Sequence, residues 1–190
     1  LETTLATERL DAYRQDGAGE ITTLARYLLN MALCESIYSP LQFAEIALRN
    51  AVHASLCDRF GTREWYDVIP AGKLLYWQTK QVIEAKDRLG RVGKQETPGG
   101  IVAELHFGFW TGFFNKGHAR TGLGFCLTEN VFSFAPKSER VLPKIDARWN
   151  NIRRLRNRVF HHERILHWTD LDDQHKALLE VVGWISPELR

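Results

Sequence analysis

The sequence predicts an all-α fold in a single domain, and three observations indicate it. Apolar residues recur every three or four positions along most of the chain, which is the period of a helix with one buried face. Prolines, glycines and capping residues stand where these periodic segments begin or end. No βαβ alternation, internal repeat or low-complexity tract is present. A chain of 190 residues with 44% hydrophobic content suits one core.

The first half of the chain is expected to begin with a short helix that contains Leu5, Leu10 and Tyr13 and ends near Gly17. The spacing of apolar residues then predicts helices over residues 21–38, 40–60 and 72–89. Between the first two of these, Ser39, Pro40 and Gln42 have the order of an N-cap, a first helical position and a capping-box partner. The prediction is therefore a helix boundary at residues 39–40.

The second half is expected to contain an aromatic helix over residues 106–114, whose five Phe and Trp side chains are typical of a core cluster. Residues 115–135 mix glycines and asparagines with scattered hydrophobic residues, which predicts an irregular insertion with one short helix. The helical pattern resumes over residues 137–160, where Pro143 either lies early or divides the helix. A capping sequence at 169–172 begins the last helix.

The formal net charge of +2 is too small to indicate nucleic-acid binding, but the cations are unevenly placed. Between Arg140 and His167, eight Lys and Arg residues face two acidic residues, so one end of the fold should be basic. The three cysteines, Cys34, Cys57 and Cys126, are far apart and typical of reduced core residues. No stretch has the length of a membrane span or the pattern of a signal peptide, and a cytoplasmic location is expected.

Residues 156–163, with the sequence RNRVFHHE, combine cations, an amide, two imidazoles and a carboxylate within two turns. Arginine keeps its charge and histidine titrates near neutral pH, a combination suited to phosphate chemistry. Arg156 and His161 lie about 140° apart on an ideal helix, so they converge only if the helix frays or bends near Phe160. Asn157 and His161 share one face. Together, the arginines and histidines of this segment contain the acid, base and fixed positive charge that cleavage of RNA by its own 2′-hydroxyl requires.

Two other interpretations of these residues stand beside this one. The first is a basic helix end, in which arginines favour the helix C-terminus, histidines cap its carbonyls and Glu163 pairs with Arg158 or Arg164. The second makes His161, His162 and Glu163 metal ligands. Adjacent residues on a helix point in different directions, and neither a cysteine nor a second His-x-x-x-His lies nearby, so no metal site is expected.

An earlier polar segment has a similar pattern. Glu45, Arg49 and His53 repeat every four residues, and Asn50 follows Arg49 as Asn157 follows Arg156. The segment is either a solvated helix face with a weak ion pair or a second polar helix that faces the basic one. Two antiparallel helices would bring both segments to one cleft.

Several segments, taken together and in order, resemble the Abi-like proteins of bacterial abortive infection, within the all-helical HEPN superfamily. They are EIALRNA at residues 45–51, the aromatic residues at 65 and 66, AELHFGFW at 103–110, and LRNRVFHHE at 155–163. The resemblance runs over most of the chain and implies a HEPN-like helical bundle over residues 1–190. It also implies a metal-independent endoribonuclease of phage defence or toxin type, with the signature Arg-x(4–6)-His.

Carried over to this chain, the signature implies Arg156, Asn157, His161 and His162 as catalytic residues. His161 has four residues between it and Arg156, and His162 has five, so the choice of acid/base between them stays open; the face shared with Asn157 favours His161. Supporting or RNA-binding roles are implied for Glu45, Arg49, Asn50, Arg153 and Arg158.

The resemblance also implies RNA as a partner, a homodimer with two copies of the motif in one composite cleft, and an antitoxin or regulatory partner. No cofactor and no membrane association are expected. The alternative function is a non-catalytic RNA-binding or protein-interaction module, including one partnered with a nucleotidyltransferase.

Overall fold

The computed structural model describes residues 7–14 and 17–189, and within these ranges every regular element is a helix, which confirms the all-α prediction. In chain order the α-helices are α2 (Thr7–Asp11), α3 (Glu20–Phe60), α4 (Trp65–Val68), α5 (Tyr76–Arg91), α6 (Pro98–Glu104), α7 (Phe107–Thr111), α8 (Lys116–Thr121), α9 (Leu123–Val131), α10 (Leu142–Phe160) and α11 (Leu171–Ile185). Two 3₁₀ turns are η1 (Gly112–Phe114) and η2 (Pro187–Leu189). Leu5 of the first predicted helix lies outside the described residues. None of the helices in these ranges combines the length and hydropathy of a membrane span.

Helix α3 is one continuous helix of 41 residues, about 60 Å long, so the predicted boundary at residues 39–40 is wrong. Pro40 lies inside it. An interior proline costs roughly 3 kcal/mol because it removes a backbone hydrogen bond. Burial offsets this cost, since Ile37, Leu41 and Ala44 continue one buried face across the proline at helical spacing.

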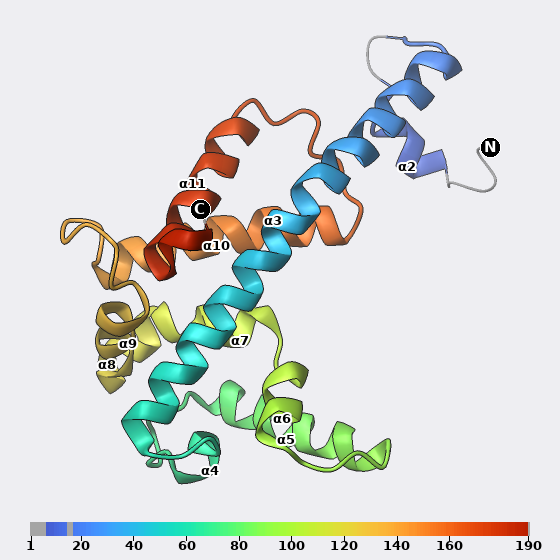
Figure 1. The fold of residues 1–190 in the computed structure, drawn as a ribbon. Coiled ribbons are helices and arrows are strands. Elements are labelled where there is room, and N and C mark those ends of the chain that lie inside the picture. Colours follow the sequence, from blue (N-terminus) through green and yellow to red (C-terminus); the bar gives the residue numbers. More distant parts are fainter. Residues whose placement is uncertain (1–6, 15–16, 190) are drawn as a thin grey trace.

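Helix α3 runs the length of the molecule, and the other elements pack around it (Figure 1). α2 and α11 contact it, α10 crosses it, and α7 and α9 pack along its second half. α4 lies at its C-terminal end, where Asp67 of α4 pairs with Lys86 of α5, and α5 packs on α6. Because α3 contacts elements from both ends of the chain, it fixes the position of α10, the helix that carries the RNRVFHHE segment.

Aromatic side chains form much of the core. The predicted core role of residues 106–114 is confirmed, because Phe107, Phe109, Trp110, Phe113 and Phe114 are all buried. Trp65 and Trp149 join them from α4 and α10, with edge-on contacts to Trp110 and Phe107 respectively. Edge-on arrangements are the ones that aromatic pairs prefer.

The prediction of an irregular insertion at residues 115–135 is wrong. This segment forms α8 and α9, and Leu123, Leu127 and Val131 of α9 are buried in the core. Gly122, in the left-handed region at φ 73°, ends α8 and leads directly into α9. Gly122 is thus a helix cap and not part of a loop. With nine residues, α9 has too few turns for its apolar spacing to stand out in the sequence.

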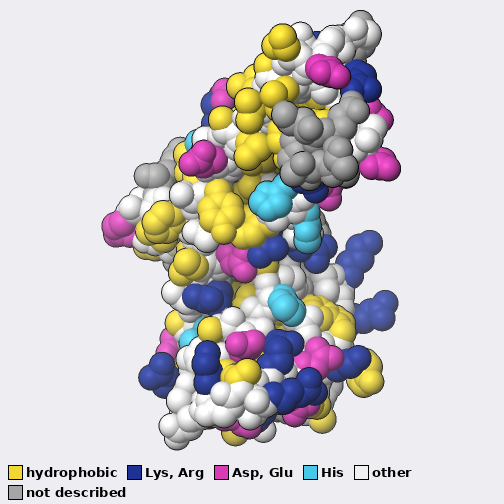
Figure 2. All heavy atoms as spheres, turned by 90° about the vertical axis from the view of Figure 1, so that its right-hand side faces the viewer, with side chains coloured by type: hydrophobic (Ala, Val, Ile, Leu, Met, Phe, Trp, Pro, Cys, Tyr) yellow, Lys and Arg dark blue, Asp and Glu magenta, His cyan; other side chains and the backbone are white. Residues whose placement is uncertain are grey.

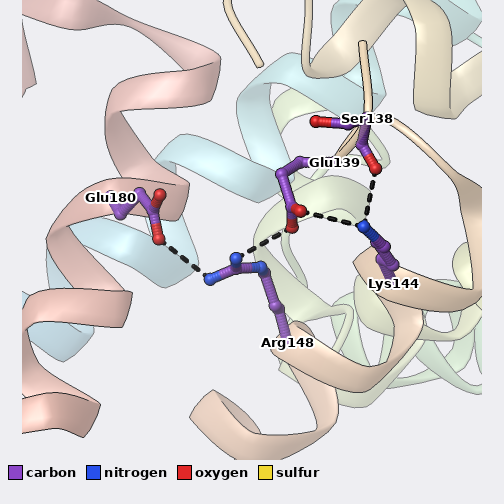
Figure 3. Close-up of polar contacts among 5 residues, drawn as sticks. All are labelled: Ser138, Glu139, Lys144, Arg148 and Glu180. Carbon is purple, nitrogen blue, oxygen red and sulfur yellow. Dashed lines mark hydrogen bonds and ion pairs between the residues drawn. The ribbon is translucent and has the colours of Figure 1, made fainter. Parts of the chain in front are cut away.

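An ion-pair network holds the first half of α10 (Figure 3). Arg148 donates through Nη1 to Glu180 of α11 and through Nη2 to Glu139, both at 2.9 Å. Lys144 donates to the other oxygen of Glu139 at 2.9 Å and to the Ser138 carbonyl at 2.7 Å. The hydrogen bonds from Lys144 and Arg148 hold the pKa of Glu139 below its usual value. The network joins α10 to α11 and to the segment before it.

Candidate functional site

The RNRVFHHE segment lies where α10 crosses α3. Three contacts define this crossing: Glu45 with Arg156, Tyr38 with Phe160, and Asn30 with Ile165. In these three pairs the residue number falls on α3, from 45 to 30, while it rises on the partner segment, from 156 to 165. The two segments therefore run in opposite directions. The buried side chains of α10, Ile145, Trp149, Ile152, Leu155 and Val159, determine which face turns to the core. Arg156 lies beside that apolar face.

Arg156 is held by two neighbours. Its Nε donates to Glu45 Oε2 at 3.2 Å, and its guanidinium carbon lies 4.2 Å from the centroid of the Phe160 ring. The Arg156 and Glu45 side chains are only 25% and 24% exposed, so water screens this pair less than a surface pair. The Phe160 ring also stacks on Tyr38, with centroids 4.5 Å apart. The terminal amino groups of Arg156 form no hydrogen bond with any residue in the described ranges.

Helix α10 ends at the histidines. His161 is the C-cap, and its backbone N–H donates to the Asn157 carbonyl at 3.0 Å. The N–H of His162 donates to Val159 and that of Glu163 to Arg158, which is the Schellman arrangement. His162 has φ 56°, and within the described residues no other non-glycine residue has a positive φ. Both imidazoles are exposed. The helix therefore breaks immediately after Phe160.

Buried Asn30 of α3 fixes the chain that follows the histidines. Its Oδ1 accepts from the backbone N–H groups of Ile165 and Leu166, at 2.8 and 3.0 Å. Its Nδ2 donates to the Glu163 carbonyl at 3.3 Å. Asn30 is 2% exposed, so these bonds replace water for three backbone groups. The sequence interpretation missed this residue, although a polar residue on the apolar face of a helix is a signal of such a role.

A basic groove lies on the next face of α10. This basic groove has a volume of about 370 Å³. Its lining residues are Asn150, Arg153, Arg154, Asn157, Arg158 and Glu163. Arg153 donates to Asn150 Oδ1 at 3.0 Å, and Asn150 donates to Asp146 at 2.9 Å. Arg158 pairs with Glu163, as the basic-helix-end interpretation predicted. Asn157 thus opens into a groove rich in cations, whereas Arg156 turns toward α3.

The earlier polar segment is divided by the structure. Glu45 faces Arg156, while Arg49 contacts its neighbour Asn50 through a weak 3.5 Å contact on the surface of α3. His53 turns away to the core, where its Nδ1 accepts from the indole N–H of Trp65 at 2.9 Å. Burial, and then the charge of Arg63, lower the pKa of His53. Of the two alternatives for this segment, a face turned to the basic helix describes Glu45, while the hydrogen bonds of Arg49 and His53 go to other residues.

Comparison of the chain with family models, with curated proteins and with solved structures finds no match. Within residues 7–14 and 17–189, no three His, Cys, Asp or Glu side chains gather closely enough to hold a metal ion.

Proposed function

We propose that this chain is a metal-independent endoribonuclease of the Abi-like type, built on a HEPN-like bundle and acting in phage defence or as a toxin. One observation carries the proposal: the Arg156 guanidinium is held between Glu45 and Phe160 in the last turn of α10, and two exposed histidines follow where the helix ends. A fixed cation and two histidines at one helix end, with a groove lined by arginines on the next face of the same helix, suit a phosphodiester.

The reaction needs no group beyond the substrate and these side chains. A neutral histidine removes the proton of the ribose 2′-hydroxyl, and the 2′-oxygen attacks the adjacent phosphorus. The bond from phosphorus to the 5′-oxygen breaks, and that oxygen takes a proton from an imidazolium. The products are a 2′,3′-cyclic phosphate and a 5′-hydroxyl. A positioned acid or base contributes roughly 10²- to 10⁴-fold in rate.

Each site residue has a role in this proposal. The free amino groups of Arg156 bind the phosphate oxygens as negative charge increases at phosphorus. His161 is the preferred acid/base because it caps the turn that contains Asn157, and His162 is the second candidate. Glu45 positions Arg156, and Arg153 and Arg158 bind the neighbouring backbone phosphates. Arg49 and Asn50 extend this surface along α3.

A homodimer would supply the second acid/base. Apolar side chains are exposed along α3, among them Leu28, Met31, Phe43 and Ile46. Figure 2 shows hydrophobic side chains gathered on the upper half of one face, with histidine side chains beside them and Lys and Arg side chains below. Such a surface supports pairing of two copies with their histidines near the interface. A cytoplasmic location and an antitoxin or regulatory partner belong to the same proposal.

The test is cleavage of single-stranded RNA of mixed sequence in the presence of EDTA. The wild type is expected to leave cyclic phosphate and 5′-hydroxyl ends, and Arg156→Ala and His161→Ala are expected to lose at least 100-fold in rate. His175→Ala, on α11 and outside the basic groove, is the matched control and should cut as the wild type does.

The result of this cleavage experiment also decides between the ribonuclease and the alternative function. The carboxylate of Glu45 already balances the charge of Arg156, which is compatible with a non-catalytic RNA-binding or protein-interaction module. Such a module, alone or with a nucleotidyltransferase, would bind RNA without cutting it. It would lose affinity in Arg156→Ala and keep affinity in His161→Ala. Wild-type protein that binds but never cuts would replace the ribonuclease proposal with this one.

A further inference from the structure

A second hollow, of about 640 Å³, lies beside the basic groove and shares two residues with it. Asn150 and Arg153 of α10 line both hollows. The other walls come from α5, α7, η1 and the start of α8, and they include Trp77, Gln81 and Lys116. The volume is within the usual range for small-ligand pockets. One aromatic ring, several amides, two cations and the carboxylate of Asp146, which accepts from Asn150, line the same space.

Two glycines allow the aromatic wall to form. A Cβ on Gly112 would lie 2.6 Å from the Trp77 ring, so only glycine lets this indole lie against η1. A Cβ on Gly117 would lie 2.8 Å from the Leu75 side chain, which lines the same hollow. The Trp77 ring is half-buried and makes an edge-on contact with Phe109. Trp77 is thus a supported ring with part of its surface open.

A buried hydrogen-bond network supports the walls. His118 and Gln78 are fully buried and bonded to each other, and Gln78 also bonds the Phe109 carbonyl at 3.2 Å. Gln81, one turn after Trp77 on α5, lines the hollow. Its Oε1 is buried and has no hydrogen-bond partner within the described residues. An unpaired buried acceptor is costly, and an N–H donor from a ligand would satisfy it.

The geometry points to this hollow as the binding site for an unpaired RNA base next to the nucleotide that is cut. The base stacks on Trp77 and donates an N–H to Gln81, while Arg153 and Lys116 bind its phosphates. Arg153 precedes Asn157 by four residues, so the two lie about 6 Å apart along α10 and one strand can reach both hollows. Aromatic stacking and readout of base edges are the usual means of recognising single-stranded RNA. The inference rests on the proposed function for its substrate.

The test is binding of a fluorescent single-stranded oligonucleotide whose 2′-hydroxyls are replaced by hydrogens, so that it cannot be cut. Trp77→Ala is expected to weaken binding roughly 10- to 100-fold, the range for losing one base–aromatic stack. Gln81→Leu, which keeps the side-chain size, should weaken it roughly fivefold. Tyr76→Ala is the matched control, because this neighbouring aromatic is 86% exposed and does not line the hollow.

The outcomes separate this inference from the ribonuclease proposal. Binding that depends on Trp77 and Gln81, without cleavage of ribose RNA, keeps the base site and removes the ribonuclease. Cleavage by the wild type, with binding by Trp77→Ala and Gln81→Leu equal to that by Tyr76→Ala, removes the base site and keeps the ribonuclease. No binding of this oligonucleotide by the wild type removes the base site, and cleavage of ribose RNA then decides the ribonuclease proposal separately. Thermal unfolding of each variant shows whether a loss reflects misfolding.

Discussion

Arg156 of α10 donates to Glu45 of α3 at 3.2 Å, although 111 residues separate them in the chain. The contact links the two polar segments and holds one cation at the end of the basic helix. We expect Glu45→Gln to keep the fold and to lower cleavage at least tenfold, because the guanidinium loses its charged partner. A double-mutant cycle with Arg156→Ala should give a coupling energy of about 1 kcal/mol, measured by urea unfolding. Additive effects on unfolding and unchanged cleavage in Glu45→Gln would contradict a positioning role.

The backbone of His162 gives a prediction of opposite sign for stability and activity. A non-glycine residue with φ 56° is strained by its Cβ, and glycine is the usual residue at this position of a Schellman turn. His162→Gly should stabilise the protein by about 1 kcal/mol, which raises Tm by about 2 to 4 °C. His162→Ala is the control, because it removes the imidazole and keeps the Cβ. Calorimetry and RNA cleavage on both variants separate the backbone effect from the imidazole effect. If His162 is an acid/base, both variants lose cleavage activity, and only His162→Gly gains stability.

Periodicity and capping chemistry are sufficient to predict the all-α fold and α10, because a long amphipathic helix repeats its pattern over many turns. They fail where one local signal conflicts with packing. Pro40 is a strong local signal for a helix start, yet the buried face of α3 continues across it. In residues 115–135, short helices capped by glycine look like loops.

The site was predictable only in part, for a similar reason. The residue pattern suggested that two antiparallel helices would bring the Glu45 and Arg156 segments to one cleft, and Glu45 does contact Arg156. Spacing alone could not say which other residues meet there, since the angle at which two helices cross depends on the whole core. His53 follows Glu45 by eight residues, a rotation of about 80°, and this turns it toward Trp65. The position of Asn30 on an apolar helix face signals a structural role, but its partners, and the role of Trp77, become visible only when the residues they contact, far along the chain, are known.

Asn30 should be among the most sensitive positions in the chain. Asn30→Ala leaves two backbone N–H groups and one carbonyl without their buried partner. A loss of about 2 to 4 kcal/mol in the free energy of unfolding is expected, because each unsatisfied buried group costs about 1 to 3 kcal/mol and water recovers part of it. Asn151→Ala, on the exposed surface of α10, should change it by less than about 0.5 kcal/mol. Equal unfolding midpoints for the two variants in urea would show that Asn30 does not hold the chain after the histidines.

His118 makes stability depend on pH. Burial lowers its pKa from 6.5 to about 4, so the folded state keeps this imidazole neutral beside Gln78. Its neutral form is favourable above pH 6.5, and stability falls as the pH drops from 6.5 toward 4, because only the unfolded state then takes up the proton. Between pH 7 and pH 5 the loss should be about 2 kcal/mol from this residue. The lowered pKa of His53 adds to the slope in the same direction. Urea unfolding of wild type and His118→Gln over this range isolates the contribution of His118, and the variant should show the shallower slope. Parallel slopes would mean that the pKa of His118 is the same in the folded and unfolded states.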